Sequence, residues 1–183
     1  NQFSKSSINV QDFYGKEAPE SRFLGFNKLN TVGDGDCLLH ALYGEENLLG
    51  QIQIPDAADM RKRLCNDIID YDKQIRPSVQ AVIARGSPAH PILRSFVELN
   101  QIEEQPQNIV NLATSLGRPG EYLGLEHVEL IARLKNLNIL VFNERTQERV
   151  ELFYNKDSQE VNHIISYNGI NHWSKLIPTS QSR

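Results

Sequence analysis

The chain has 183 residues, of which 39% are hydrophobic and 23% are charged, and its formal net charge is −4. This composition predicts one ordinary globular domain and excludes an intrinsically disordered chain. The negative balance argues against nucleic acid as a partner, because binding to phosphates needs a basic surface. No apolar run approaches the length of a membrane span, and the first residues lack the basic-then-apolar pattern of a signal peptide.

The chain holds two cysteines and no Asn-x-Ser/Thr sequon, which favours a reducing compartment and hence a cytoplasmic location. It begins with Asn1 and no methionine, so we expect a piece of a longer protein. We expect a polar lead-in over residues 1–20, one domain over residues 21–178 and a tail over residues 179–183.

The first two thirds of the chain carry helical signals. Residues 23–29 form a short apolar run that leads into an Asp/Gly turn, and the apolar residues 37–42 do not alternate, so a helix is expected to start at Cys37. Pro55 opens a helix of about 16 residues with a 3.6-residue apolar period, which Pro77 is expected to break. Two or three more helices are predicted over residues 77–116, which makes residues 55–116 a helical arm. Another helix is predicted from about Glu126 to Leu137.

Strand signals dominate the last third. Residues 138–142, 149–154, 161–167 and 173–177 are predicted strands, with a turn at Asn168-Gly169 before the last. The order predicts an α+β protein with one mixed or antiparallel sheet of about five strands flanked by helices.

Cys37 is the strongest candidate for chemistry. It lies between an Asp/Gly turn and the first turn of a helix, where unpaired N–H groups and the helix dipole favour thiolate. We expect Gly35 to adopt a positive φ, so that the N–H groups of Asp34, Asp36 and Cys37 converge as an oxyanion site.

A calcium loop and a zinc site are the metal alternatives for this turn. Asp34, Asp36 and Glu45 fit an EF-hand register, but Leu39 then stands where that loop needs glycine. Cys37, His40 and Cys65 lack the spacing of zinc ligands. No metal or cofactor is expected. A buried structural cysteine is the commonest alternative for any free cysteine, and it is our interpretation of Cys65.

His172 is the histidine with the best context for a general base. It follows a glycine-containing turn and precedes Trp173, the only tryptophan. A cysteine with a distant histidine is typical of cysteine hydrolases, in which the two meet only on folding. The pair is expected to rest partly as thiolate and imidazolium. His40 is interpreted as a packing residue, and His163 as a strand residue without chemistry.

The segment Asp34-Gly35-Asp36-Cys37-Leu38, with Ala41, resembles the cysteine box of the ovarian-tumour (OTU) family of deubiquitinases. Residues 120–124 with the following helix and strand look like the family's middle segment, and residues 167–173 look like its histidine strand. The resemblance covers about Asn27 to Ile177. It implies a papain-like OTU fold and a thiol hydrolase that cleaves at the C-terminal glycine of ubiquitin.

The resemblance also implies roles for single residues. Cys37 matches the nucleophile, His172 the general base and acid, and Asp34 the residue that shapes the oxyanion site. Many members carry Asp or Asn two positions after the histidine, where this chain has Ser174. The residue that orients His172 is therefore open. The candidates are Ser174, Asn171 and the upstream Asp12.

The aromatic residues Trp173 and Tyr122 are expected as walls of a narrow channel for the glycine tail, and residues 77–116 as the surface facing ubiquitin. The expected partner is ubiquitin or polyubiquitin, bound by a monomer, in the cytoplasm or, for a secreted effector, the host cytosol. Ser174 leaves open an inactive ubiquitin-binding module. The sequence is also compatible with an enzyme for another ubiquitin-like modifier, a small-substrate amidase or a purely structural interaction domain.

Overall fold

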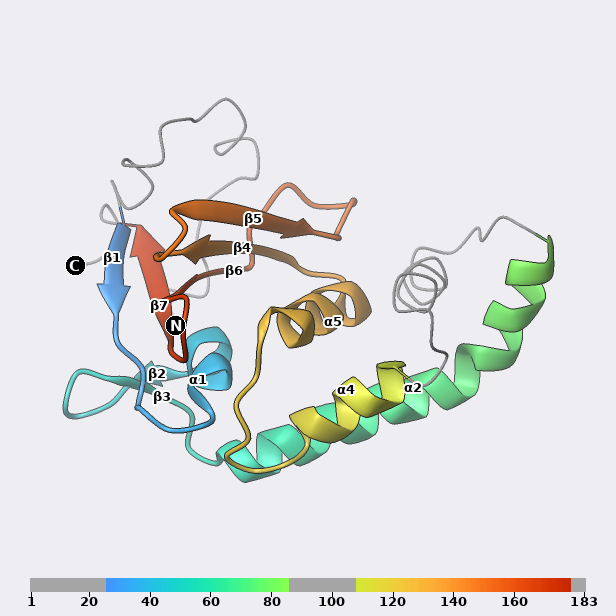
Figure 1. Cartoon of the computed structure of the whole chain (residues 1–183), viewed down its shortest axis with the longest axis horizontal. Helices are drawn as coiled ribbons and strands as arrows, with labels where there is room; N and C mark the ends of the chain where they lie inside the picture. Colours follow the sequence, from blue (N-terminus) through green and yellow to red (C-terminus); the bar gives the residue numbers. More distant parts are fainter. Residues whose placement is uncertain (1–25, 86–107, 179–183) are drawn as a thin grey trace. The chain divides into compact units, whose positions relative to one another are not determined.

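A computed structural model describes residues 26–85 and 108–178 of the chain (Figure 1). The predicted lead-in and tail lie outside these residues, as does Asp12. The described residues fall into two compact units: one comprises the residues up to Ala57 and from Leu137 onward, and the other comprises residues 58–136.

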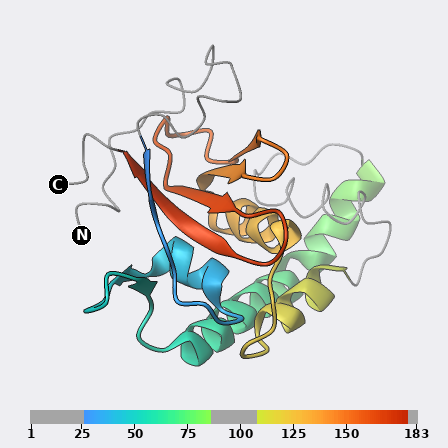
Figure 2. The same ribbon diagram turned by 60° about the vertical axis from the view of Figure 1, so that its left-hand side comes forward.

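The first unit is built on a five-stranded sheet with the strand order β1-β7-β6-β4-β5. Only β4 and β6 run parallel, and the other neighbours are antiparallel. Figure 2 shows β1 (blue) alongside β7 (red), although the two strands come from opposite ends of the chain. The strands are β1 Phe26–Leu29, β4 Asn138–Asn143, β5 Glu148–Phe153, β6 His163–Tyr167 and β7 Trp173–Pro178.

Both faces of this sheet are buried around its middle strands. One face carries an apolar cluster centred on Leu140 and Phe142, against which Phe26 packs. Trp173 and Lys175 alternate to the other side of β7, as the two-residue period of a strand requires. Helix α1, Cys37–Tyr43, packs against β7 and β6, and its first six residues are buried. This packing brings the cysteine turn to the start of β7.

A small hairpin follows α1 and was not predicted from the sequence. Strands β2, Glu45–Glu46, and β3, Ile52–Gln53, pair antiparallel. A strand of two residues is too short to show an alternating pattern, so the sequence offered no signal for it. Ile52 is fully buried and also forms a parallel bridge with Thr31. The hairpin is thereby fixed to the chain just before the cysteine turn.

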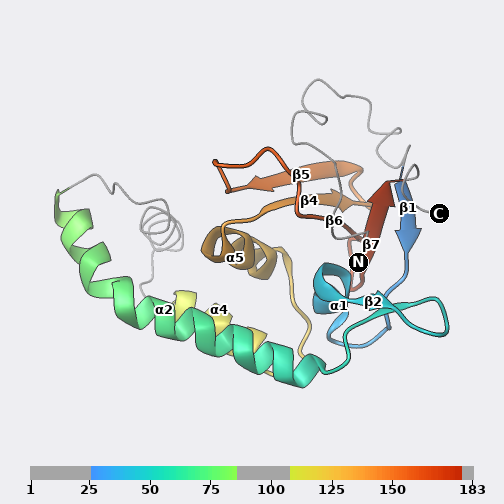
Figure 3. The same cartoon turned by 180° about the vertical axis from the view of Figure 1, so that it is seen from behind.

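The second unit is helical and holds α2, Ala57–Arg85, α4, Asn108–Leu116, and α5, Leu125–Lys135. The prediction that Pro77 ends the first helix is wrong, because α2, which is 29 residues long, continues through Pro77 to Arg85. A proline inside a helix removes one hydrogen bond and bends the helix without necessarily ending it. The ribbon of α2 bends in its green C-terminal part (Figures 1 and 3). Of the helices predicted over residues 77–116, α4 is present, and residues 86–107 lie outside the described part.

The guanidinium of Arg61 organises this second unit. Arg61 is fully buried in α2 and donates hydrogen bonds to backbone carbonyls at the end of α4 and in the loop that follows. Gly117 lies against Cys65, since a Cβ at position 117 would stand 3.0 Å from the Cys65 sulfur. Cys65 was expected to be buried, but it is only half-buried. The carbonyls bound by Arg61 belong to Ser115, Leu116, Arg118 and Glu121.

The predicted α+β class with a five-stranded mixed sheet is confirmed. Every predicted strand of the last third is present, with ends shifted by one or two residues. Among the described helices, none has both the length and the apolar character that crossing a membrane requires.

Candidate active site

The carboxylate of Asp34 fixes the cysteine turn. Its Oδ1 accepts the backbone N–H of Asp36 at 2.9 Å and lies 3.1 Å from Nε2 of His40. Cys37 follows as the first residue of α1 and is 1% exposed. One side chain therefore ties the cysteine turn to the first turn of α1. None of these hydrogen bonds joins Asp34 to His172.

His40 is a buried structural link on α1. Its Nδ1 accepts the backbone N–H of Ile54 at 3.1 Å, so this nitrogen carries no proton. The ring proton therefore lies on Nε2, which donates to the carboxylate of Asp34. The packing role expected for His40 agrees with its 1% exposure, and the ring in addition connects the turn to the chain after β3.

The expected oxyanion site at this turn is not formed. The N–H of Asp34 donates to the carbonyl of Val32 at 3.0 Å, that of Asp36 to the Asp34 side chain, and that of Cys37 to the Asp34 carbonyl at 3.3 Å. The described glycines with a positive φ are Gly50, Gly120 and Gly169, so the positive φ expected for Gly35 is wrong. The Asp34 side chain thus accepts one of the three amides, and the backbone carbonyls of Val32 and Asp34 accept the other two.

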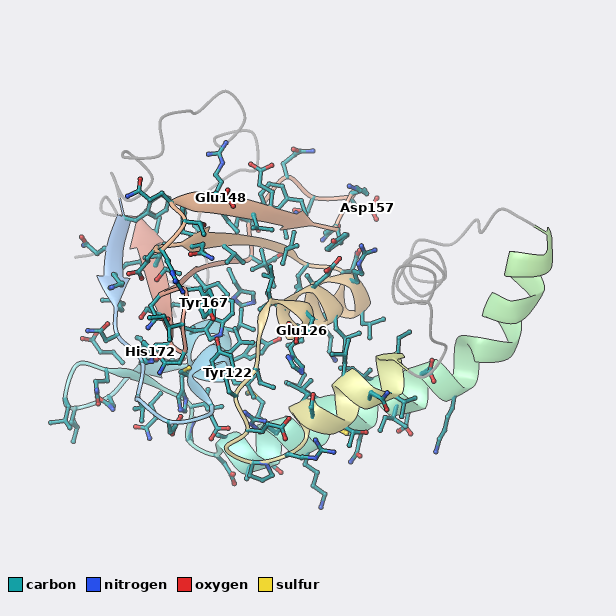
Figure 4. All side chains as sticks on the ribbon, in the orientation of Figure 1. Tyr122, Glu126, Glu148, Asp157, Tyr167 and His172 are labelled. Carbon is teal, nitrogen blue, oxygen red and sulfur yellow. The ribbon has the colours of Figure 1, made fainter. Side chains whose placement is uncertain are left out.

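The loop before β7 is organised by Asn168. Its Oδ1 accepts the backbone N–H groups of Ile170, Asn171 and His172 at 2.8, 2.8 and 3.0 Å. Tyr167 adds a hydrogen bond from its hydroxyl to the carbonyl of Ile170 at 3.0 Å. Figure 4 shows the labelled Tyr167 and His172 at this end of the sheet. The backbone that carries the His172 ring is thus held in one conformation.

Thr31 binds the imidazole of His172. Its Oγ1 lies 3.1 Å from Nε2 of His172 and donates its own hydrogen to the carbonyl of Trp173 at 2.6 Å. A hydroxyl has one hydrogen, so toward His172 the oxygen acts as an acceptor. Nε2 therefore carries the ring proton, and Nδ1 of the neutral ring is left with a lone pair that can take a proton.

The structure brings Cys37 next to the peptide that follows His172. The backbone of Trp173 hydrogen-bonds the Cys37 sulfur, and the N–H groups of Cys37 and Leu38 in the first turn of α1 also interact with it. These donors stabilise a thiolate. The sulfur therefore lies where α1 meets the start of β7, the strand that His172 immediately precedes.

The electrostatics of the free site favour a neutral thiol and a neutral imidazole. Burial raises the pKa of the Cys37 thiol, and the negative charge of Asp34 raises it further. Burial lowers the pKa of His172, as does Lys28, against smaller opposing effects of Glu144 and Asp34. Both shifts oppose the charge separation of the thiolate–imidazolium pair that is expected at rest. The physical reason is the loss of water around the sulfur.

The other predicted site residues are placed differently from the expectation. Ser174 and Asn171 were candidates to orient His172, but the partner of the ring is Thr31. Ser174 is buried opposite Ser166 in the sheet, and Asn171 accepts a hydrogen bond from the Asn168 amide at 3.2 Å. In both cases the backbone path, which the sequence does not give, decides where the side chain lies.

The aromatic walls expected for a channel are also placed differently. Trp173 is 0% exposed and stacks on Tyr167 with ring centroids 4.7 Å apart, so its ring is not an exposed wall. Its contribution at the site is its backbone. Tyr122 belongs to the second unit and is 37% exposed. Within residues 26–85 and 108–178, no cluster of three His, Cys, Asp or Glu side chains is arranged to hold a metal ion.

The sequence analysis did not identify Thr31 and Asn168 as residues of the candidate site. Thr31 and His172 are 141 positions apart, and no local pattern marks a threonine that will meet a distant histidine. For Asn168 a signal existed, because asparagine before glycine predicts a turn and its side chain commonly accepts nearby backbone N–H groups. The turn was recognised, but its role in holding His172 was not.

The fold is similar to those of solved OTU domains. The OTU domain of human OTUD1 matches with a TM-score of 0.51 at 12% identity, over 87% of this chain and 92% of that one. The viral OTU domain protease from Taggert virus matches with a TM-score of 0.49 at 15% identity, over 96% and 86%. An OTU domain solved in complex with ubiquitin matches with a TM-score of 0.47 at 17% identity, over 82% and 69%. No protein-family profile and no curated protein sequence matches the chain. The likeness lies in the fold.

Proposed function

Because this chain has the OTU fold, we propose that it is a cysteine-dependent deubiquitinase that hydrolyses the amide bond after the C-terminal glycine of ubiquitin. The observation that supports the proposal is that the Cys37 sulfur, at the start of α1, is hydrogen-bonded by the backbone of Trp173, the residue that follows His172. The resemblance of the Asp34–Leu38 segment to the OTU cysteine box supplies the substrate class. The cytosol, either the cell's own or that of a host, is the compartment in which such a substrate is met.

The chemistry begins from the neutral pair. Nδ1 of His172 accepts the proton of the Cys37 thiol as the sulfur attacks the glycine carbonyl, and a tetrahedral oxyanion forms. The carbon–nitrogen bond then breaks, and the amine leaves with the proton from His172. Water, deprotonated by His172, hydrolyses the thioester, which frees the glycine carboxylate and returns the proton to the thiol.

Thr31 has a positioning role in this scheme. When His172 gains the thiol proton, the ring carries protons on both nitrogens, and the Thr31 oxygen continues to accept the one on Nε2. A hydroxyl is a weaker acceptor than a carboxylate, so it stabilises the imidazolium less than Asp would. Backbone hydrogen bonding at Trp173, and to a smaller extent at Leu38 and Cys37, lowers the pKa of the Cys37 thiol and so favours the thiolate that forms.

The test is labelling with a ubiquitin probe that carries a C-terminal electrophile. Wild type and Cys65→Ser are expected to form a covalent adduct, while Cys37→Ala and His172→Ala are not. Cys65 is the matched control, because it is the other cysteine of the chain and lies in the second unit. Absence of an adduct with wild type, under conditions in which a known thiol protease reacts, contradicts the proposal.

A second candidate is a ubiquitin-binding module with little or no activity. It is favoured by the raised pKa of Cys37 together with the turn amides that already bind Val32 and Asp34. Cleavage of a diubiquitin panel separates the two candidates. The enzyme cleaves at least one linkage and loses this activity in Cys37→Ala, whereas the binding module retains affinity for ubiquitin in both proteins and cleaves none.

A further inference from the structure

The turn of the β2–β3 hairpin presents two leucines to solvent. Leu48 and Leu49 are 104% and 85% exposed, the two highest values among the large hydrophobic residues exposed in the described part of the chain. A single exposed leucine is ordinary, but two adjacent ones at the end of a projecting turn form an apolar contact surface. We call residues Leu48 and Leu49 the leucine tip. Figure 3 shows the hairpin projecting beside α1.

The leucine tip is held in a defined conformation. The side-chain oxygen of Asn47 accepts the backbone N–H groups of Leu49 and Gln51 at 2.8 and 3.0 Å, and its amide donates to Gln53 at 3.0 Å. Gly50 closes the turn with a φ of +80°, which glycine adopts without strain. An ordered loop loses little conformational entropy on binding, so the exposed leucines are suited to contact a partner.

The surroundings of the leucine tip are acidic. Glu45 and Glu46 form β2 and are both exposed, and residues 44–54 contain no lysine or arginine. A Cβ built at Gly50 would stand 3.7 Å from a carboxylate oxygen of Glu46, so this charge lies at the turn itself. The matching partner is therefore a protein surface with an apolar centre and basic residues around it.

The hairpin is also bonded to both halves of the candidate active site. Ile52 donates its N–H to Asn30 at 2.8 Å and accepts that of Val32 at 3.1 Å, and these bonds flank Thr31. Ile54, just after β3, donates to His40, which holds Asp34. A partner seated on the leucine tip is thereby held at a fixed position relative to Cys37.

From this arrangement we propose that the leucine tip is a docking contact for the folded body of the ubiquitin whose C-terminal tail enters the Cys37 site. Ubiquitin has the required chemistry, an apolar surface patch with basic residues beside it. This inference rests on the proposed function, since it assigns the surface that binds the substrate of that same site.

The experiment measures binding of ¹⁵N-labelled ubiquitin by NMR titration to three proteins, all with Cys37→Ala. The first has no further change, the second adds Leu48→Ser and Leu49→Ser, and the third adds Leu48→Met and Leu49→Met. The serine changes are expected to raise Kd about tenfold or more, as for a central apolar contact. The methionine control, which keeps the apolar surface, is expected to stay within about twofold. Changing Glu45 and Glu46 to Gln is expected to weaken binding and to reduce its dependence on salt.

An unchanged Kd in the serine variant overturns the docking inference. The docking inference is also overturned if the serine changes alter self-association of the free chain in sedimentation while the affinity for ubiquitin stays the same. The partner of the leucine tip is then a second copy of this chain. Failure of the proposed function looks different, since wild type then does not react with the electrophilic ubiquitin probe. If only the docking inference fails, the protein with intact Cys37 reacts with the probe, and the serine changes leave the rate unaltered.

Discussion

Thr31 Oγ1 lies 3.1 Å from Nε2 of His172 and 2.6 Å from the carbonyl oxygen of Trp173. One hydroxyl thus joins the imidazole to the backbone that also binds the Cys37 sulfur. Because its hydrogen goes to the carbonyl, its oxygen can only accept from His172, which fixes the ring tautomer. The partner of the His172 ring is therefore a threonine from the chain before the cysteine turn, and not Ser174 or Asn171 from its own strand and loop.

Replacing Thr31 with Val is expected to lower kcat/KM for a ubiquitin substrate by about tenfold or more, since the loss of a buried hydrogen-bond partner costs about 1–3 kcal/mol. Thr31→Ser keeps the hydroxyl and is the matched control, expected within about threefold of wild type. The pH profile separates positioning from plain destabilisation, because loss of the acceptor for Nε2–H weakens the imidazolium and moves the acidic limb to lower pH. Equal profiles and rates for Thr31→Val and wild type contradict the role.

Asn168→Ala is expected to loosen the loop that carries His172, because three backbone N–H groups lose their common acceptor. Faster hydrogen exchange at Ile170 and Asn171 and a drop in kcat of about tenfold or more are the expected results. Asn168→Asp retains the acceptor oxygen and serves as the control. If the alanine variant exchanges as slowly as wild type at these amides, Asn168 does not hold the loop.

Asp34→Asn is expected to make Cys37 more reactive toward iodoacetamide. The negative charge of Asp34 contributes to the raised pKa of the thiol, and an amide at this position can still accept the Asp36 N–H while carrying no charge. The pKa of Cys37 then falls, and alkylation at about pH 8 speeds up by about two- to fivefold. Asp36→Asn is the control, and all proteins in this experiment carry Cys65→Ser so that only Cys37 is alkylated. An alkylation rate in Asp34→Asn that is no higher than in Asp36→Asn contradicts the prediction.

His163 is expected to make the free energy of unfolding depend on pH. Burial, together with Lys175, lowers the pKa of His163 to about 4. The pKa of histidine in the unfolded chain is about 6.5, so between about pH 6.5 and pH 4 the unfolded chain binds a proton that the native chain does not. The free energy of unfolding therefore falls as pH falls through this window, by at most about 3 kcal/mol. Urea denaturation from about pH 7 to 4.5 measures it. His163→Phe, which keeps a ring against Tyr43, is expected to flatten the slope, and an unchanged slope excludes His163 as the cause.

Arg61→Met is expected to destabilise the helical unit by about 3–5 kcal/mol, because it leaves several buried carbonyls without a donor. Arg63→Met is the matched control on the same helix: its side chain is 66% exposed and forms an i,i+4 ion pair with Asp59, so we expect a loss below about 1 kcal/mol. Urea denaturation gives the two values, and hydrogen exchange at residues 116–121 shows where protection is lost. Similar losses for both variants contradict the structural role of Arg61.

Local sequence was sufficient for the elements that carry a repeated pattern. The alternating or continuous apolar runs of β4, β5, β6 and β7 predicted these strands, and the apolar residues after Cys37 predicted α1. The helix through Pro77 was not predicted, because the sequence shows the lost N–H but not the packing that keeps the helix intact. The hairpin that presents Leu48 and Leu49 was missed for a different reason, since its two-residue strands have no period.

The sequence by itself determined the chemistry-bearing residue types of this protein: a cysteine at a helix start and a histidine before a strand, each with its local turn. The tertiary structure alone decided their partners. Thr31 meets His172 across 141 positions, and His40 joins Asp34 to Ile54. Such contacts depend on which strands pair and in which register, and that is fixed by burial of the whole sheet rather than by any short segment.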